Sequence, residues 1–126
     1  MIVPTCPLCG SEAECVDSAY LYHGKSYGNV WRCPTHQDIY VGCHKDGDGR
    51  KPKGTLADFE TREARKKAHA CFDPMWMGKG APMKREAAYL WLANTLGISR
   101  DETHIGLFDV TRCERVVEAM KGLVQA

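Results

Sequence analysis

Two short cysteine-containing motifs constrain this sequence more than any other feature. The first is Cys6-Pro7-Leu8-Cys9, and the second, after 23 intervening residues, is Cys33-Pro34-Thr35-His36. Two ligands separated by two residues on a tight turn can both reach one metal ion, and paired motifs with this spacing are typical of structural zinc sites. The sequence therefore predicts one zinc ion held by Cys6, Cys9, Cys33 and His36.

The fourth ligand has alternatives in the sequence. Cys43 and His44 follow seven and eight residues after His36 and carry equally suitable donor atoms. The spacing favours His36, because it repeats the spacing of the first motif. Four protein ligands leave no open position for water, and this favours a structural over a catalytic metal.

The chain contains seven cysteines, and their use bears on the compartment. In a reducing compartment, closely spaced cysteines indicate metal binding rather than disulfides, and we expect Cys15, Cys71 and Cys113 to be small buried apolar residues. No apolar run reaches the ~18–20 residues of a membrane span, and the N-terminus lacks the pattern of a signal peptide. We therefore expect a cytoplasmic protein without a membrane partner.

Charge is unevenly distributed along the 126 residues. The formal net charge is +1, but residues 31–88 carry twelve basic and eight acidic side chains, a net charge of +4. A mildly basic segment permits a nucleic-acid partner without requiring one.

The first part of the chain has the pattern of short strands. Three apolar segments rich in β-formers, 19–22, 30–32 and 39–41, are separated by turn residues such as those at 23–28. The pattern predicts β-hairpins. Residues 46–54 are hydrophilic and rich in glycine, and we expect a flexible connector there.

The remainder of the chain has helical periodicity. A capping pattern at Thr55–Asp58 predicts a helix from about Leu56 to Phe72 that ends before Pro74. Its apolar positions are Leu56, Phe59, Ala64, Ala68, Cys71 and Phe72. A second helix is expected over about 83–96, with Gly97 after its end and Ala87, Leu90, Trp91 and Leu92 or Asn94 on its apolar face.

Asp109 is suited to cap a third helix, whose apolar positions are Cys113, Val116, Val117, Met120, Leu123 and Val124. The prediction is an α+β fold: an N-terminal β-rich zinc ribbon, residues 1–54, packed as one unit against about three C-terminal helices in residues 55–126.

Several blocks of the sequence resemble one family. They are Cys6-Pro7-x-Cys9, Tyr27-Gly28-x-Val30-Trp31-x-Cys33-Pro34, Tyr40-Val41-Gly42-Cys43-His44, Gly54-Thr55-Leu56-Ala57, Ala68-His69-x-x-Phe72-Asp73-x-x-Trp76, Glu86-Ala87-x-x-x-Trp91-Leu92 and His104-Ile105-Gly106-x-Phe108-Asp109. The chain is similar to an uncharacterised zinc-finger-containing domain family of bacteria and their phages. The resemblance implies the zinc site and the fold but no activity. In that family the second motif is usually Cys-x-x-Cys, so His36 is a departure that keeps Cys43 as an alternative.

One pair of residues outside the zinc motifs has catalytic potential. His69 and Asp73 lie four residues apart on the first predicted helix, where they form either a general-base pair or a helix-end hydrogen bond. A nuclease of the HNH type also combines zinc motifs with a nearby histidine, but it needs further metal ligands on the following helix. An enzyme is therefore the third functional hypothesis.

Aromatic and basic residues alternate between positions 20 and 53, and such a surface can stack bases and contact phosphates. The first hypothesis is accordingly a zinc-dependent module that binds DNA or RNA, and the second is a protein-interaction adaptor or regulatory factor that binds a host protein. The candidate nucleic-acid contacts are Tyr22, Lys25, Arg50, Lys51, Lys53, Arg62 and Lys66. The alternative for the rings is that they form the core of a small sheet.

Overall fold

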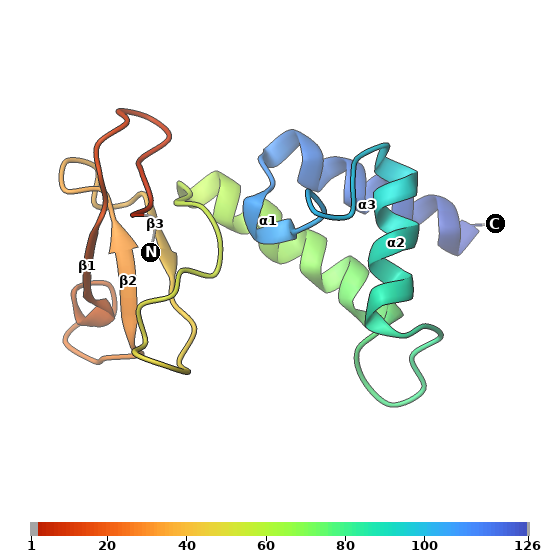
Figure 1. Ribbon diagram of the computed structural model, residues 1–126, viewed down its shortest axis with the longest axis horizontal. Coiled ribbons are helices and arrows are strands. Elements are labelled where there is room, and N and C mark those ends of the chain that lie inside the picture. Colours follow the sequence, from red (N-terminus) through yellow and green to blue (C-terminus); the bar gives the residue numbers. More distant parts are fainter. Residues whose placement is uncertain (1–2, 126) are drawn as a thin grey trace. The chain divides into compact units, whose positions relative to one another are not determined.

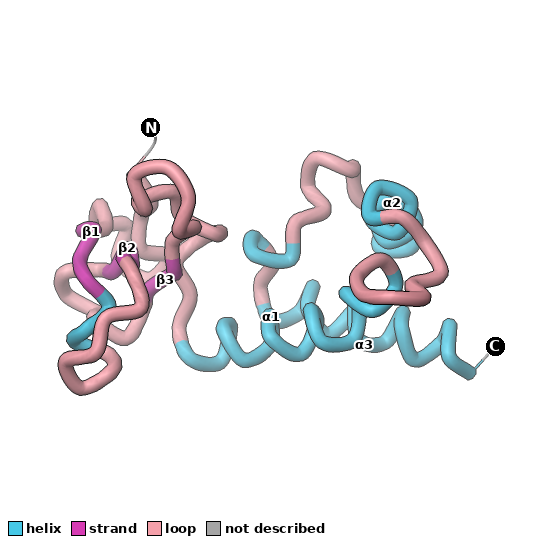
Figure 2. Tube along the Cα trace, turned by 90° about the horizontal axis from the view of Figure 1, so that it is seen from below, coloured by secondary structure: helices cyan, strands magenta, loops and turns pink. Residues whose placement is uncertain are grey.

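The three strands precede the three α-helices along the chain, as Figure 1 shows for this computed structural model, which describes residues 3–125. The chain divides into two compact units, Met1–Glu60 and Thr61–Ala126. Figure 2 shows the strands confined to the first unit and the α-helices concentrated in the second. The predicted α+β class is confirmed. Among the described residues, no helix combines the length and apolarity needed to cross a membrane.

The first unit is built on a small antiparallel sheet. Its strands are β1 (Glu14–Asp17), β2 (Asn29–Arg32) and β3 (Tyr40–Gly42), in the order β1-β2-β3. Trp31 of the central strand pairs with Cys15 on one side and with Val41 on the other. Paired residues share one face of a sheet, so the Trp31 ring lies over the centre of that face. Around it is a buried cluster of Cys6, Ala13, Trp31, Cys33, Ile39, Val41, Cys43 and Leu56.

The strand expected at 19–22 is wrong. The strand lies earlier, in β1, and residues Ser18–Tyr20 form a single 3₁₀ turn. The Asp17 carboxylate causes the change, because it accepts hydrogen bonds from Ala19 N and from Ser26 Oγ, both at 2.8 Å. A side chain that satisfies the backbone ahead of it in this way favours a turn over a strand.

The segment expected to be a flexible connector, 46–54, is held against the sheet. The Trp31 indole Nε1 donates to the carbonyl oxygen of Arg50 at 2.7 Å, and Asn29 Nδ2 donates to that of Gly49 at 3.0 Å. Backbone bonds add to this, from His44 N to Lys51 O and from Lys53 N to Gly42 O. The expectation of a flexible connector is therefore corrected, since buried or half-buried donors of β2 find their acceptors in this segment.

The first helix begins three residues later than predicted. α1 spans Phe59–Phe72, whereas Ala57 exchanges two backbone hydrogen bonds of 3.1 Å with Tyr40 of β3. Leu56 is 2% exposed and belongs to the buried cluster of the first unit. The burial of Leu56 and the pairing of Ala57 override the helix-start pattern at Thr55–Asp58, because tertiary contacts outweigh a local capping preference.

Two further helix ends agree with the sequence prediction: the C-terminus of the second helix and the N-terminus of the third. α2 spans Arg85–Leu96, and Gly97 follows it in the left-handed conformation with φ of 73°. Ile98 N bonds to Ala93 O and Gly97 N to Asn94 O, the pair of bonds that closes a Schellman motif. α3 spans Val110–Gln125, and the Asp109 carboxylate caps it by accepting from Arg112 N at 2.8 Å.

The core of the second unit takes residues from all three α-helices. Its buried members are Ala68, Phe72, Met75, Ala88, Tyr89, Leu92, Leu96, Ile105, Phe108, Cys113, Val116 and Met120. Two predicted core positions on α2 are wrong, because Ala87 and Leu90 are exposed and Ala88 and Tyr89 are buried instead. Phe59 and Leu123 are also exposed, at 67% and 42%, and the side chain of Val124 lies outside the described residues.

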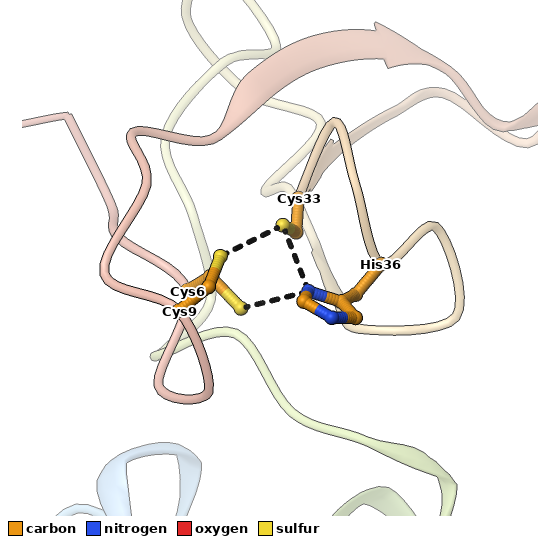
Figure 3. A group of neighbouring side chains, drawn as sticks. All are labelled: Cys6, Cys9, Cys33 and His36. Carbon is orange, nitrogen blue, oxygen red and sulfur yellow. Dashed lines mark hydrogen bonds between the residues drawn. The ribbon is translucent and has the colours of Figure 1, made fainter.

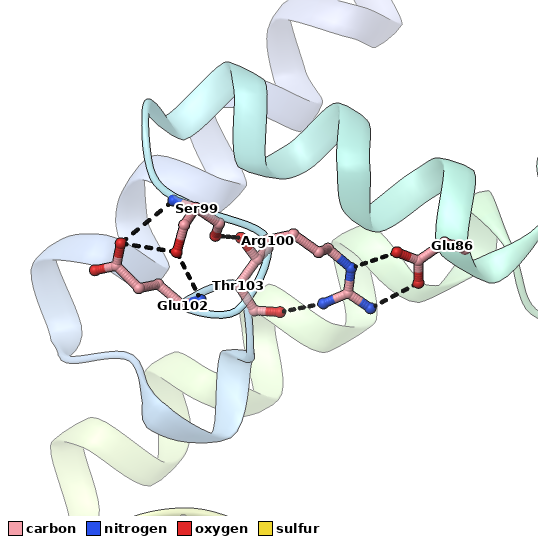
Figure 4. A network of polar contacts seen from close by, with 5 residues as sticks. All are labelled: Glu86, Ser99, Arg100, Glu102 and Thr103. Carbon is pink, nitrogen blue, oxygen red and sulfur yellow. Dashed lines mark hydrogen bonds and ion pairs between the residues drawn. The ribbon is translucent and has the colours of Figure 1, made fainter.

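The turn between α2 and α3 is fixed by polar contacts (Figure 4). Thr103 is fully buried and donates from Oγ1 to Ser99 O at 2.6 Å. Arg100 forms a two-pronged ion pair with Glu86, with both N–O distances at 3.0 Å, and its guanidinium also lies over the Tyr89 ring. This pairing lowers the pKa of Glu86. The second unit therefore has its own caps and core, independent of any metal.

We predict that Trp31→Phe loosens the segment 44–53. The substitution removes the only indole donor to Arg50 O among the described contacts and leaves a small void, at a cost of roughly 1–3 kcal/mol. Hydrogen exchange should show faster exchange at the amides of His44 and Lys53. Trp91→Phe, which removes an indole from the second unit, is the control and should leave those amides unchanged. Unaltered exchange in Trp31→Phe would contradict this account.

Candidate metal centre

The first pair of candidate ligands lies on a tight hairpin at the start of the chain. Thr5 and Glu12 form an antiparallel bridge, and Cys6 N donates to Ser11 O at 2.9 Å. The Gly10 N–H donates a hydrogen bond to Cys6 O at 2.8 Å, and Gly10 has φ of 76°. The turn needs a left-handed residue at this point, which glycine adopts without steric cost. The closed turn brings the side chains of Cys6 and Cys9 to the same side.

The second pair lies on the turn that joins β2 to β3. Cys33 directly follows β2, and its N–H donates to Ile39 O at 3.1 Å. Ile39 N in turn donates to His36 O at 2.9 Å. These bonds close the loop between the two strands and place Cys33 and His36 on its inner side. The sheet thus fixes the second motif directly, because its first ligand continues the central strand.

The four side chains converge (Figure 3). Their ligand atoms, three Sγ and one ring nitrogen, all lie within 4.8 Å of one another. The Sγ atoms of Cys9 and Cys33 are 3.6 Å apart, and His36 Nδ1 lies 3.5 Å from Cys33 Sγ and 4.0 Å from Cys6 Sγ. Cys6 and Cys33 are buried, His36 is half-buried, and Cys9 is exposed.

These separations fit one tetrahedral ion. Two sulfurs each at about 2.3 Å from a tetrahedral zinc lie roughly 3.8 Å apart, and a sulfur and an imidazole nitrogen lie about 3.5 Å apart. Three cysteines and one histidine are also the donor set that zinc prefers in closed structural sites. The arrangement can hold a metal, and with four protein donors it leaves no position for a substrate.

The thiols of Cys9 and Cys33 differ in their pKa. The pKa of Cys9 is lowered to about 6, chiefly because the Ser11 hydroxyl, 3.3 Å away, and the Ser11 backbone N–H both donate to the thiolate. Burial instead raises the pKa of Cys33. An exposed thiolate is a good first contact for a metal ion, because ligands must be deprotonated to bind.

Cys43 and His44 lie away from this cluster. Cys43 N donates to Asn29 O, so Cys43 is opposite the first residue of β2, whereas Cys33 follows the last. Four residues of extended strand separate the two ends by roughly 13 Å. Burial, together with the neighbouring Cys15, raises the pKa of Cys43 to about 11, as expected of an unionised buried thiol.

The predicted nucleic-acid contacts fall on two different units. Tyr22, Lys25, Arg50, Lys51 and Lys53 lie on the first unit and are at least partly exposed, whereas Arg62 and Lys66 lie on α1 in the second. Trp31 is one of the aromatic residues between positions 20 and 53, but its ring is 6% exposed and belongs to the core.

A groove in the first unit was not predicted from the sequence. It has a volume of about 420 Å³ and lies at the end of β2 that starts with Asn29. Its lining residues are Ser18, Tyr22, Tyr27, Asn29, Val30, Gly42, Cys43, Lys45 and Lys53. The turn residues at 23–28 predicted a loop in the sequence, but not a groove. Only the fold places the β1–β2 loop beside the segment 44–53.

His69 and Asp73 are in contact at the end of α1. His69 Nδ1 lies 3.2 Å from the nearer carboxylate oxygen, so the helix-end hydrogen bond is present. Beside the pair is an open depression formed by Ala70, Pro74 and Met77. The metal cluster belongs to the first unit and this pair to the second.

Comparison with known proteins places the chain in one family. A family described as a zinc-finger-containing domain, of unknown function, matches residues 2–123. No curated protein and no solved structure shows significant similarity to the chain. The match covers nearly the whole sequence, including both cysteine motifs, α1, α2 and most of α3. The chain is therefore a member of this zinc-finger-containing domain family.

Proposed function

We propose that the first unit is a structural zinc module that binds nucleic acid. The convergence of four ligand atoms within 4.8 Å is the observation that carries the zinc assignment. Cys6, Cys9, Cys33 and His36 would hold the ion, which would supply a cross-link between the N-terminal hairpin and the β2–β3 turn. No catalytic role follows, because all four positions of a tetrahedral site are filled by protein.

The first unit has a small apolar core for its size. Its buried cluster contains eight residues, and three of them are cysteines. A core of this kind rarely stabilises an isolated small module, and structural metals commonly supply the difference. Cys6 and Cys33 are both ligand candidates and core residues, so metal binding and folding of residues 4–45 are coupled.

We predict that His36→Ala lowers zinc affinity much more than Cys43→Ala or His44→Ala. Loss of a direct ligand removes a metal bond, whereas the other two side chains lie at the opposite end of the strand. The purified protein should contain one zinc per chain, and competitive titration with a chromophoric chelator gives the order of affinities. If Cys43→Ala is the most damaging variant, the ligand set is wrong.

Zinc retention should depend on pH through Cys9. The Ser11 hydroxyl stabilises the Cys9 thiolate, so Ser11→Ala should raise the pKa of Cys9 from about 6. Protons then compete with the metal at a higher pH, and the midpoint of zinc release on acidification should move upward. Ser99→Ala, which removes a hydroxyl of the second unit, is the control. Identical release curves for both variants would refute the role of Ser11.

The nucleic-acid part of the proposal rests on charge and exposed rings. Lys25, Lys45, Arg50, Lys51 and Lys53 are exposed on the first unit, and all but Lys25 lie in the ordered segment 44–53. Tyr22 and Tyr27 expose 46% and 53% of their surface. Cations on an ordered backbone can contact phosphates, and exposed rings can stack on bases, as on surfaces that bind without sequence preference.

We predict weak binding whose affinity falls as salt rises. Anisotropy titrations with single- and double-stranded DNA and RNA should show the counterion-release slope expected of a few phosphate contacts. Replacing Lys51 and Lys53 with Glu should weaken binding about tenfold and flatten the slope, while zinc content stays at one per chain.

The matched control for charge is Lys79→Glu with Lys84→Glu. These exposed lysines lie in the second unit, and the double substitution changes the net charge by the same amount. If no nucleic acid binds at low salt, a protein-interaction adaptor becomes the better explanation of the zinc module.

A further inference from the structure

We propose that the groove between the β1–β2 loop and the segment 44–53 is a subsite for one unstacked base and its neighbouring phosphate. The inference deepens the proposed function and depends on it: the ligand class becomes single-stranded nucleic acid. The groove, its two rings and its two ammonium groups are all on the first unit.

Two rings form one wall of the groove. Tyr22 and Tyr27 meet edge to face, with ring centroids 4.8 Å apart and an angle of 74° between their planes. In this geometry the ring that presents its edge keeps both faces unstacked by its partner. Both residues line the groove and are about half exposed, so a planar ligand can reach a ring face there.

Positive charge lies beside the rings. Lys45 and Lys53 line the groove, and its lining residues include no carboxylate. Lys25 adds a third ammonium group, with Nζ 5.3 Å from the Tyr27 ring centroid. Stackable rings and adjacent cations, in a groove whose described lining residues include no carboxylate, match a base followed by a phosphate, which is the repeating unit of a nucleic acid.

The loop that carries the rings is held in place before any ligand binds. Ser18 is 2% exposed, and its hydroxyl oxygen accepts from Tyr27 N at 2.8 Å while its own N–H donates to Gly28 O at 2.9 Å. Lys25 N also donates to Tyr22 O at 3.1 Å. A preordered loop loses little conformational entropy on binding, which favours a ligand-binding over an incidental surface loop.

The shape of the groove favours single strands over duplexes. Its volume of about 420 Å³ lies within the range of about 300–1,000 Å³ found for small-ligand pockets. In a duplex both faces of each base are covered by neighbouring base pairs, so a ring inside a groove has no base face to meet. In a single strand one base can leave the stack and enter.

The groove and the metal centre lie at opposite ends of the central strand. Asn29, which begins β2, lines the groove, whereas Cys33 follows the end of the strand and belongs to the metal cluster. A variant in the groove therefore need not disturb the ligands of the metal, and the two sites can be tested separately.

The experiment compares a normal strand with one that has no bases. The full-length, zinc-loaded chain is titrated with a labelled oligothymidylate of about 12 nucleotides, within the ~4–16-nucleotide range of single-strand sites. The second probe is an abasic strand with the same number of phosphates, and the third is a duplex of the same length. We expect the oligothymidylate to bind about tenfold more tightly than the abasic strand, the magnitude expected for stacking of one base.

Tyr22→Leu removes a ring and should abolish this difference while leaving affinity for the abasic strand unchanged. Tyr22→Phe keeps the ring and should retain the difference. Phe59→Leu removes an exposed ring of the first unit that does not line the groove, and should have no effect. Zinc content and circular dichroism verify that each variant is folded.

The outcomes separate this inference from the proposed function. Equal binding of the normal and abasic strands by the unmodified chain, with loss of affinity in the Lys51→Glu and Lys53→Glu double variant, would overturn the base subsite but preserve nucleic-acid binding. Preference for the duplex would also overturn it. Absence of binding to every strand would overturn both.

Discussion

The convergence of two short turns on one point is the constraint on which the first unit depends. Cys6 and Cys9 come from the N-terminal hairpin, and Cys33 and His36 come from the turn that joins β2 to β3. Three thiol groups packed this closely beside an imidazole repel one another once they ionise, unless a cation lies among them. The same cluster contributes Cys6 and Cys33 to the apolar core, so two of the candidate ligands are also core residues.

Trp31 connects the candidate metal cluster to the rest of the first unit. It lies at the centre of the three-stranded sheet, two residues before the ligand Cys33, and its indole holds the backbone of Arg50. The segment that carries the basic residues is thereby fixed to the strand that carries the metal ligand. The candidate metal ligands and the basic segment are thus connected through one buried side chain.

The second unit is stabilised by other means. It has a twelve-residue buried core, a Schellman motif after α2, a carboxylate cap on α3 and an ion-paired turn between them. None of these needs a metal, and these features alone explain its fold. The His69–Asp73 contact is a helix-end interaction of the same kind, and the binding chemistry proposed for the chain is concentrated in the first unit.

The sequence by itself determined the four candidate ligands, the order of strands and helices, and the two helix ends that depend on local chemistry at Gly97 and Asp109, because spacing and capping act within a few residues. It could not decide which face of α2 is buried, since Tyr89, Leu90, Trp91 and Leu92 are consecutive apolar residues and only packing selects among them. Leu56 and Ala57 lie in a helix-start pattern of the sequence. In the structure Leu56 is buried in the core of the first unit and Ala57 pairs with Tyr40, so both residues precede the helix. The groove likewise required the tertiary structure, because its two sides come from segments about twenty residues apart that meet only when the sheet forms.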